Sequence, residues 1–488
     1  MPTARNLLKA IHDPLDPAAF TDLGLVLLKA ALGFALLIVV FAVWKSVTLL
    51  VLFLALLLGG VAAWWLFQHP VANLCTLILG FSLIAGFEDG TQPTEVLYGL
   101  YYMAFLGHWY VTRLFLYREP IFERREARVL ALFLVLATLS VGLTLLFDGD
   151  LRFYIGEWLS LSFLALYFPV REAVTRHRYG MHAVMGAVLV LALWVFVRNT
   201  INYQQILIDA AYAWQVTRGR AVTNTSILMV PLFAGLVYFL HAPRMRKAWF
   251  SGGVFGIFFA SLIMTQSRGY WVAFAGACIV LMALMPPRQR GRLIGVGLAS
   301  IVGIVAVGYL ILGDVFVLVA TGLLDRVLSI GTAASEDISL INRFRETAAV
   351  MDKVWANPIV GYGMGVPFRF WDMTFIPPFH HVTTFLHNGY VALWYKFGLW
   401  GLGMVLFVWG SSIRNAVRVY RSPARPFLRL AALGVAGFLI SLTISSLTSN
   451  PFYINDPMFM FGIAAGLAAG ARELALQESP TSDLQSVA

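Results

Sequence analysis

Long apolar runs dominate this chain, and short polar or charged stretches separate them. Each run has about the 20 residues that a helix needs to cross the hydrocarbon core of a bilayer. A membrane barrel would instead show short segments of alternating hydrophobicity. The pattern therefore predicts an all-α, polytopic integral membrane protein with about 14 transmembrane helices. We place them at approximately residues 23–42, 47–67, 71–87, 96–113, 128–147, 150–168, 180–197, 223–241, 248–265, 268–286, 292–312, 386–410, 428–448 and 456–472.

One connecting segment, residues 313–385, is much longer than a connection requires, and a structureless loop of that length would be unusual. Apolar residues recur every three or four positions from Ile341 to Trp355, which predicts a helix that ends at Asn357-Pro358. A glycine-rich turn and an aromatic stretch follow. The predicted organisation is an N-terminal segment 1–22, helices 1–11 in 23–312, the partly helical loop 313–385, helices 12–14 in 386–472, and a tail 473–488.

Composition and charge support this interpretation. Only 12% of the residues are charged, against about 25% in soluble proteins. The excess of 35 basic over 25 acidic residues has a topological explanation, because Lys and Arg hold loops on the cytoplasmic side, so we predict no nucleic-acid partner. Most basic residues fall in alternate loops when the N-terminus is inside. Both termini are therefore predicted to be cytoplasmic, and the long loop lies on the opposite face.

Several arginines run against this charge rule and fall on the outer side. Arg268 lies in Thr265-Gln266-Ser267-Arg268-Gly269-Tyr270-Trp271, between two spans with almost no loop. An arginine fork suits phosphate oxygens, so a cluster of forks at the outer surface would bind a phosphorylated lipid. The alternative is that these side chains snorkel or pair with loop carboxylates. The other candidates for phosphate binding are Arg198, Arg218, Arg220 and Arg343.

His387 opens the span that follows the long loop, in His387-Asn388-Gly389-Tyr390. A histidine at this position is a candidate general base near neutral pH, and a hydrogen-bonded interface residue is the alternative. His380, His381 and His387 do not have the i, i+4 spacing of a helical zinc site. We therefore predict neither a metal nor a cofactor.

Three motifs occur in order along the second half of the chain. They are Ser267-Arg268-Gly269, then Arg343 followed by the Pro358–Gly363 turn, then His387-Asn388-Gly389-Tyr390 with Lys396-Phe397-Gly398-Leu399-Trp400-Gly401 beyond it. Together they resemble the bacterial O-antigen ligase and O-antigen polymerase superfamily over about residues 195–410. The family often has Glu where Lys396 stands, so we assign Lys396 no role.

The resemblance implies a multi-pass glycosyltransferase of the bacterial inner membrane that works at the periplasmic face. Its donor would be an undecaprenyl-pyrophosphate-linked glycan, and its acceptor a glycan or glycolipid hydroxyl. In a single inverting displacement, His387 would accept the acceptor proton while Arg268 neutralises the departing pyrophosphate. Asn388 is a further candidate contact. Tyr362, Trp371 and Tyr390 are candidates to stack on sugar or line the lipid groove, and interfacial anchoring is the alternative for each.

Polymerase and ligase share this chemistry and differ in the acceptor. A polymerase uses another lipid-linked repeat, with a chain-length regulator as a candidate partner, whereas a ligase uses lipid A core. We favour the polymerase, because the number of predicted spans is high for a ligase. A lipid-linked glycan transporter is a more distant alternative. It would be expected to carry acids deep in its spans and to show an inverted repeat, and neither is evident.

Overall fold

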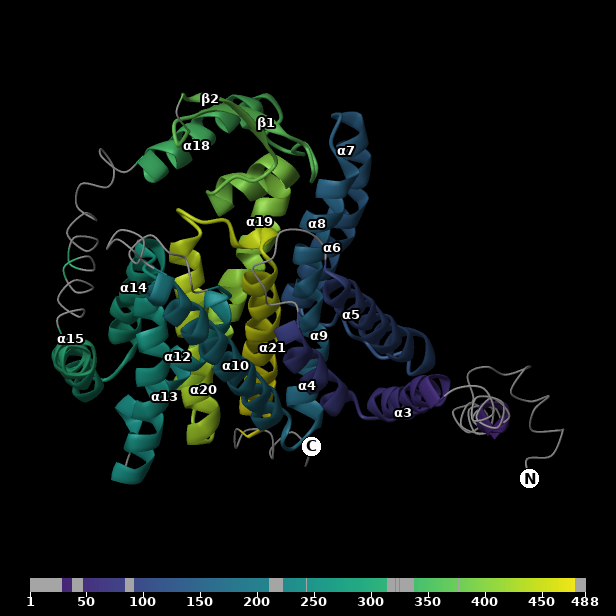
Figure 1. The fold of residues 1–488 in the computed structure, drawn as a ribbon, viewed down its shortest axis with the longest axis horizontal. Coiled ribbons are helices and arrows are strands. Elements are labelled where there is room, and N and C mark those ends of the chain that lie inside the picture. The colour runs from purple at the N-terminus through teal and green to yellow at the C-terminus, as the bar shows by residue number, and fades with distance from the viewer. Residues whose placement is uncertain are drawn as a thin grey trace, which may run out of the picture. The chain divides into compact units, whose positions relative to one another are not determined.

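The computed structural model describes residues 29–36, 47–83, 92–209, 223–242, 244–313, 321, 324, 338–375 and 377–478 (Figure 1). The chain divides into two compact units. One comprises Met1–Leu74 and Gly99–Ile121, and the other comprises Cys75–Tyr98 and Phe122–Ala488. The described part of the first unit is mostly helical. It holds α3 (Val47–Gln68), the first residues of α4 (Pro70–Gly80), most of α5 (Pro93–Val111) and the π-helical turn η2 (Thr112–Leu116).

The second unit is mostly helical and contains every described residue of the predicted site. Its helices after the first unit are α6 (Arg125–Leu139), α7 (Val141–Leu146), α8 (Leu151–Ser162), η3 (Phe163–Leu166), α9 (Tyr167–Arg176), α10 (Gly180–Asp209), α12 (Thr225–His241), α13 (Met245–Met264), α14 (Arg268–Leu284), α15 (Pro287–Leu312), α18 (Ile338–Ala356), α19 (Gly389–Arg421), α20 (Pro426–Ser445), η4 (Pro451–Tyr453) and α21 (Asn455–Gln477).

The membrane-type helices confirm the class of protein but not the predicted number of spans. Among the described residues, seven helices are long and apolar enough to cross a bilayer, or eight if the bent pair Leu57–Gln68 and Pro70–Leu83 is one span. The bend follows from Pro70, which disfavours helix at the preceding residue. Two more apolar helices, α12 and α14, are shorter than the others. The predicted number of about 14 is therefore not confirmed, and most of the predicted first span lies outside the described residues.

Helices α12, α20 and α21 form the centre of the second unit, where most side chains are buried. Glycines bring α21 unusually close to the α8–η3–α9 span. A Cβ at Gly462 would lie 2.3 Å from the Phe163 carbonyl oxygen, and one at Gly466 would lie 2.7 Å from the Tyr167 carbonyl oxygen. Small residues at four-residue spacing are a typical means of close helix contact in membranes. The helix also runs five residues past the predicted tail boundary at 472, to Gln477.

Residues 338–388, here called the loop module, contain the predicted loop helix and also a two-stranded antiparallel sheet. Strand β1 (Phe368–Asp372) pairs with β2 (Phe379–Thr383), with Phe370 opposite His381. This hairpin departs from the predicted all-α fold, because the aromatic stretch alternates between buried and exposed positions as a strand does. Helix α18 confirms the predicted loop helix and ends at Ala356, just before Asn357-Pro358.

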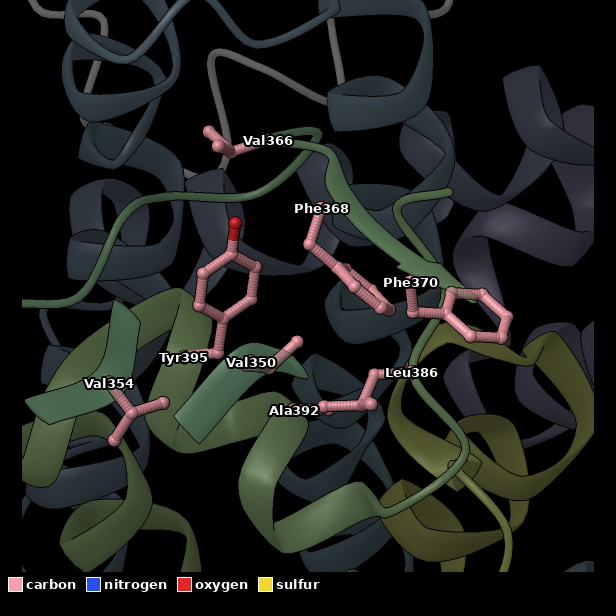
Figure 2. Packing of buried hydrophobic residues seen from close by; sticks show 8 residues of the cluster. All are labelled: Val350, Val354, Val366, Phe368, Phe370, Leu386, Ala392 and Tyr395. Carbon is pink, nitrogen blue, oxygen red and sulfur yellow. The ribbon is translucent and has the colours of Figure 1, made fainter. Parts of the chain in front are cut away.

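The loop module has its own apolar core, which fixes it on the first turns of α19 (Figure 2). Valines of α18, phenylalanines of β1 and residues of α19 meet there. The buried face of α18 carries residues at four-residue spacing, and two of the four are polar. The apolar residues that predicted the helix do not form its buried face, since Phe344 and Trp355 are 57% and 64% exposed. The buried stripe comprises Asn342, Glu346, Val350 and Val354.

A kink at Gly398 binds the glycine-rich turn to α19. Gly398 has φ +65°, which frees the carbonyl of Tyr395 from its usual partner, the N–H of Leu399. The Tyr395 carbonyl accepts from the N–H of Tyr362 at 2.9 Å, and the N–H of Leu399 donates to the Pro358 carbonyl at 2.8 Å. A Cβ at Gly398 would lie 2.0 Å from the Ile359 carbonyl oxygen, so only glycine fits here.

Lys396, which we assigned no role, forms a buried ion pair beside this turn. It is fully buried, and its Nζ lies 3.3 Å from Glu157 Oε1 and 3.0 Å from the Val366 carbonyl oxygen. The other oxygen of Glu157 accepts from the Gly365 N–H at 2.9 Å. The pair therefore ties α8 and α19 to the end of the glycine-rich turn, and it satisfies two backbone groups that would otherwise be buried without partners.

Candidate functional site

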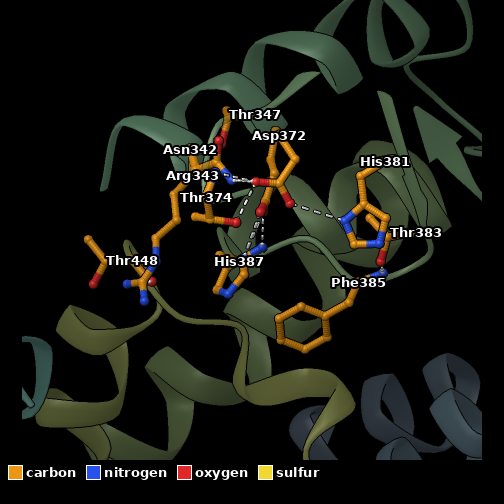
Figure 3. Close-up of polar contacts among 11 residues, drawn as sticks. Asn342, Arg343, Thr347, Asp372, Thr374, His381, Thr383, Phe385, His387 and Thr448 are labelled. Atoms are coloured by element: carbon orange, nitrogen blue, oxygen red, sulfur yellow. Dashed lines mark hydrogen bonds and ion pairs between the residues drawn. The ribbon is translucent and has the colours of Figure 1, made fainter. Parts of the chain in front are cut away.

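His387 and Glu346 form the central pair of the site. Figure 3 labels His387 together with polar residues around it. The Nδ1 atom of His387 lies 2.8 Å from Glu346 Oε2, and the backbone N–H of His387 donates to the same oxygen at 3.2 Å. Glu346 is only 4% exposed, whereas the His387 side chain is 37% exposed. From this contact we assign the proton to Nδ1, which leaves the Nε2 lone pair free to accept a proton. The pair has the arrangement of a general base that a buried carboxylate orients.

Sequence reasoning missed Glu346. It lies on α18 one helical turn from Asn342 and three residues after Arg343, inside a segment that we interpreted only by its apolar residues. A signal was present, because polar residues at i and i+4 share one face of a helix. Their burial becomes evident only once α18 packs on the hairpin and on the residues before α19.

Asn342 and Asp372 join α18 to the hairpin. The Asn342 amide donates to Asp372 Oδ1 at 2.5 Å, and the Thr374 N–H and hydroxyl donate to the same oxygen at 2.8 and 2.6 Å. His381 Nδ1 lies 3.3 Å from the other carboxylate oxygen. Burial opposes ionisation of Asp372, but the hydrogen bonds from Thr374, Asn342 and His381 outweigh it and hold its pKa below the usual value. A second histidine–carboxylate pair therefore stands beside the first.

The three sequence motifs converge on one turn, residues 446–450, which follows α20. Arg343 Nη1 donates to the Thr448 carbonyl at 2.6 Å. The Gly389 N–H donates to the Ser446 carbonyl at 2.9 Å, which fixes the start of α19 beside His387. A Cβ at Gly269 would lie 3.5 Å from the Thr448 hydroxyl oxygen. The turn thus holds the Arg268 motif, Arg343 and the His387 motif around one point.

Arg268 is the first residue of α14, after a tight turn in which Gln266 has φ +48°. The Trp271 indole N–H donates to the Leu262 carbonyl at 2.9 Å, which closes this turn across the ends of α13 and α14. Arg268 therefore sits at a helix N-terminus, where backbone N–H groups and the helix dipole favour an anion. This position agrees with the predicted phosphate contact without testing it.

Arg198 lies on α10, and its Nη2 donates to the Thr223 hydroxyl at 2.7 Å and to the Asn224 side chain at 2.8 Å. Helix α10 approaches the Arg268 motif through Tyr203, whose hydroxyl lies 3.4 Å from Gln266 Nε2. Arg198 thus lies on a helix that contacts the site. The other two predicted phosphate contacts, Arg218 and Arg220, lie outside the described residues.

The structure gives Asn388 and Tyr390 contacts within the protein. Asn388 caps α19, since its side chain accepts from the Val391 N–H at 3.1 Å. The Tyr390 hydroxyl donates to the Thr443 carbonyl at 2.7 Å, and its ring stacks near Trp409. Both residues fix the helix that follows His387, and a contact with sugar or lipid stays a prediction for each.

Tyr362 and Trp371 lie in different surroundings. The Tyr362 hydroxyl donates to the Lys353 carbonyl at 3.0 Å, and its ring packs against Phe147 and Tyr395, so it belongs to the core beneath the glycine-rich turn. Trp371 is 41% exposed on β1 and packs edge-on against His380. Of the two, Trp371 offers the more accessible aromatic face for a sugar.

A cavity of about 340 Å³ collects the polar residues of the loop module, and it lies within the usual size range of small-molecule sites. Among the residues that the structure describes, no three His, Cys, Asp or Glu side chains lie close enough together to hold a metal ion. The lining of the cavity includes Arg343, Glu346, Asp372, His381 and His387. These residues can transfer a proton through a histidine that lies beside an arginine.

Comparison with known proteins agrees with the three motifs. No curated protein matches the chain. One family model does match, and it is described as O-antigen ligase. The matched residues run from α13 through the loop module into α19, and so include Arg268, Arg343, Glu346 and His387. Residues 253–408 of this chain thus match the O-antigen ligase family, which supports the O-antigen ligase and polymerase superfamily that the motifs predicted.

Proposed function

We propose that this protein is an inverting membrane glycosyltransferase. It moves an undecaprenyl-pyrophosphate-linked glycan onto an acceptor sugar hydroxyl at the periplasmic face of the inner membrane. The observation that carries the proposal is the His387–Glu346 pair, which shares a cavity with Arg343. The family match supports O-antigen ligase or related polymerase activity in general.

In the proposed reaction, the acceptor oxygen attacks the anomeric carbon of the donor while His387 Nε2 takes the hydroxyl proton. The bond from the anomeric carbon to pyrophosphate breaks, and its electron pair leaves with the pyrophosphate. Because there is one displacement, the anomeric configuration inverts. A positioned base of this kind contributes roughly 10²–10⁴-fold to the rate.

Glu346 and the arginines have separate tasks in this reaction. The Glu346 carboxylate holds His387 in the reactive tautomer and stabilises the imidazolium that forms. Arg343, which donates to the 446–450 turn, and Arg268, whose neighbour Gly269 lies against that turn, neutralise the charge that grows on the leaving pyrophosphate. An electrostatic contact of this kind is typically worth about 3–4 kcal/mol in the transition state. The reaction needs no metal or cofactor in this scheme.

The acceptor separates two candidate functions. The sequence favours a polymerase, which extends another lipid-linked repeat with a chain-length regulator as partner. The description of the matching family favours a ligase, which transfers the glycan to lipid A core. A deletion strain tests both. A polymerase deletion leaves single repeats on the surface, whereas a ligase deletion leaves polymer on the lipid carrier. Normal surface polysaccharide in the deletion strain would contradict the proposed function.

A further inference from the structure

A second and larger cavity adjoins the His387 cavity. Its volume is about 920 Å³, at the upper end of the range for small-molecule sites. It lies between the start of α8, the strand β2 and the residues after η4. Three residues of β2 and its extension, His381, Thr383 and Phe385, line both cavities. A ligand in the larger cavity would therefore be in contact with the wall of the smaller one.

We infer that this cavity is the binding site for the acceptor glycan, which extends its reacting hydroxyl past His381 to His387. This inference rests on the proposed function and adds to it a place for the acceptor. The position of His381 carries the argument, because it is part of the wall that the two cavities share. Its ring is 41% exposed, and Asp372 fixes Nδ1, so Nε2 is the accessible nitrogen.

The lining of the cavity is suited to a sugar. Ser160, Thr383 and Asn455 offer neutral hydrogen-bonding groups, and the Ser160 hydroxyl donates to Asn455 Oδ1 at 2.7 Å. Phe153 and Phe385 add aromatic surface, and Phe153 is 53% exposed. Hydroxyl and amide groups pair with sugar hydroxyls, while aromatic faces cover the apolar faces of the sugar ring.

Charge assigns this cavity to the acceptor rather than to the pyrophosphate end of the donor. Asp148 and Asp150 line it against one arginine, Arg152, and the third carboxylate of the lining, Glu157, is paired with Lys396. Like charges disfavour a diphosphate in such surroundings. Of the two cavities, Arg343 lines only the smaller one. The Arg268 motif and Arg343 both lie at the 446–450 turn. The donor pyrophosphate and the acceptor glycan would then approach His387 from different sides.

Gly156 offers a way to block the larger cavity without disturbing the protein. It lines the cavity on α8, and a Cβ built there meets no atom within 4 Å. Gly156→Leu should therefore fill cavity space and clash with a bound glycan. Gly142→Leu is the matched control, because Gly142 lies on α7, has the same open surroundings and lines neither cavity.

The test uses the full-length protein in nanodiscs and two binding measurements. One probe is the lipid-free oligosaccharide that mild acid releases from the surface glycan of the host strain, and the other is the lipid-linked donor. We expect Gly156→Leu to weaken oligosaccharide binding by about tenfold or more and to leave donor binding unchanged. Gly142→Leu should change neither.

Weaker donor binding with unchanged oligosaccharide binding would assign the cavity to the donor and overturn the inference. Unchanged binding of both probes would overturn it too. Failure of the proposed function has a different signature, since the wild-type protein would then transfer no glycan in the turnover assay. The binding comparison between Gly156→Leu and Gly142→Leu does not depend on that turnover.

Discussion

The Nδ1 atom of His387 lies 2.8 Å from a carboxylate oxygen of Glu346, a residue 41 positions earlier in the chain. The carboxylate is buried on α18, and the imidazole is partly exposed before α19. The pair therefore depends on how α18 packs against the residues before α19. It also separates two tasks in the predicted chemistry: His387 moves the proton, and Glu346 orients His387.

His387→Ala should lower turnover by about 10²-fold or more, because a general base acts in the transition state. Binding of the lipid-linked donor should stay near normal. Glu346→Gln keeps the shape of the side chain but removes its charge, so we also expect turnover to fall by about 10²-fold with little effect on donor binding. Purified variants would be assayed for donor binding and for product separately.

Thr347→Ala is a suitable control for these variants, since Thr347 follows Glu346 and its hydroxyl donates to the Arg343 carbonyl one turn earlier. It should retain nearly full turnover. A His387→Ala enzyme with near-normal turnover would remove His387 as the base. The mechanism would then depend on leaving-group stabilisation by arginine alone.

Arg268→Ala should impair both donor binding and turnover. The pyrophosphate carries charge before the reaction and gains more as the glycosidic bond breaks, so the loss in the transition state should be about 3–4 kcal/mol. Arg268→Lys should rescue activity only in part, because an ammonium group lacks the planar fork of arginine. Arg246→Ala, on the predicted cytoplasmic side, is the control. Full rescue by Lys would show that charge alone suffices.

Lys396→Met should destabilise the protein by about 3–5 kcal/mol, because it leaves the Glu157 carboxylate buried without its cation. The double variant Lys396→Met/Glu157→Gln should recover much of that loss, since replacing both charges of a buried pair is often close to neutral. Thermal unfolding of both variants in the same detergent gives the comparison. A double variant that is no more stable than the single one would contradict this account of the pair.

A reporter fused after Arg125 should be cytoplasmic, and one inserted at Ala333, outside the described residues, should be periplasmic. The reason is the alternation of basic loops along the sequence. A phosphatase that is active only in the periplasm, paired with a fluorescent protein active only in the cytoplasm, would report each side. Both fusions on one side would contradict the predicted topology and with it the periplasmic site.

Activity should survive treatment with EDTA. The proposed reaction uses His387 and arginine, and the three loop histidines lack the spacing of a helical metal site. Turnover of the purified enzyme would be measured before and after chelation, with divalent ions added back one at a time. Loss of turnover that one defined ion restores would make His380 and His381 candidate ligands instead.

The sequence by itself determined the class of protein and the identity of the key motifs. Runs of about 20 apolar residues have few stable alternatives to membrane helices, because a bilayer leaves backbone groups no water to bond. The helix that ends before Asn357-Pro358 and the turn with positive φ at Gly361, Gly363 and Gly365 were also predictable. Local chemistry dictates both, since proline stops a helix and glycine tolerates φ above zero.

The tertiary structure decided how these parts meet. In the sequence, Glu346 is one polar residue of a predicted helix, and its burial follows only from the packing of α18. Lys396 had no assigned role, and only the structure shows that it is buried against Glu157. Neither pairing leaves a signal at short sequence separation, because the partners lie on different elements. The hairpin, the shared wall at His381 and the meeting of three motifs on residues 446–450 likewise depend on long-range packing, which periodicity cannot report.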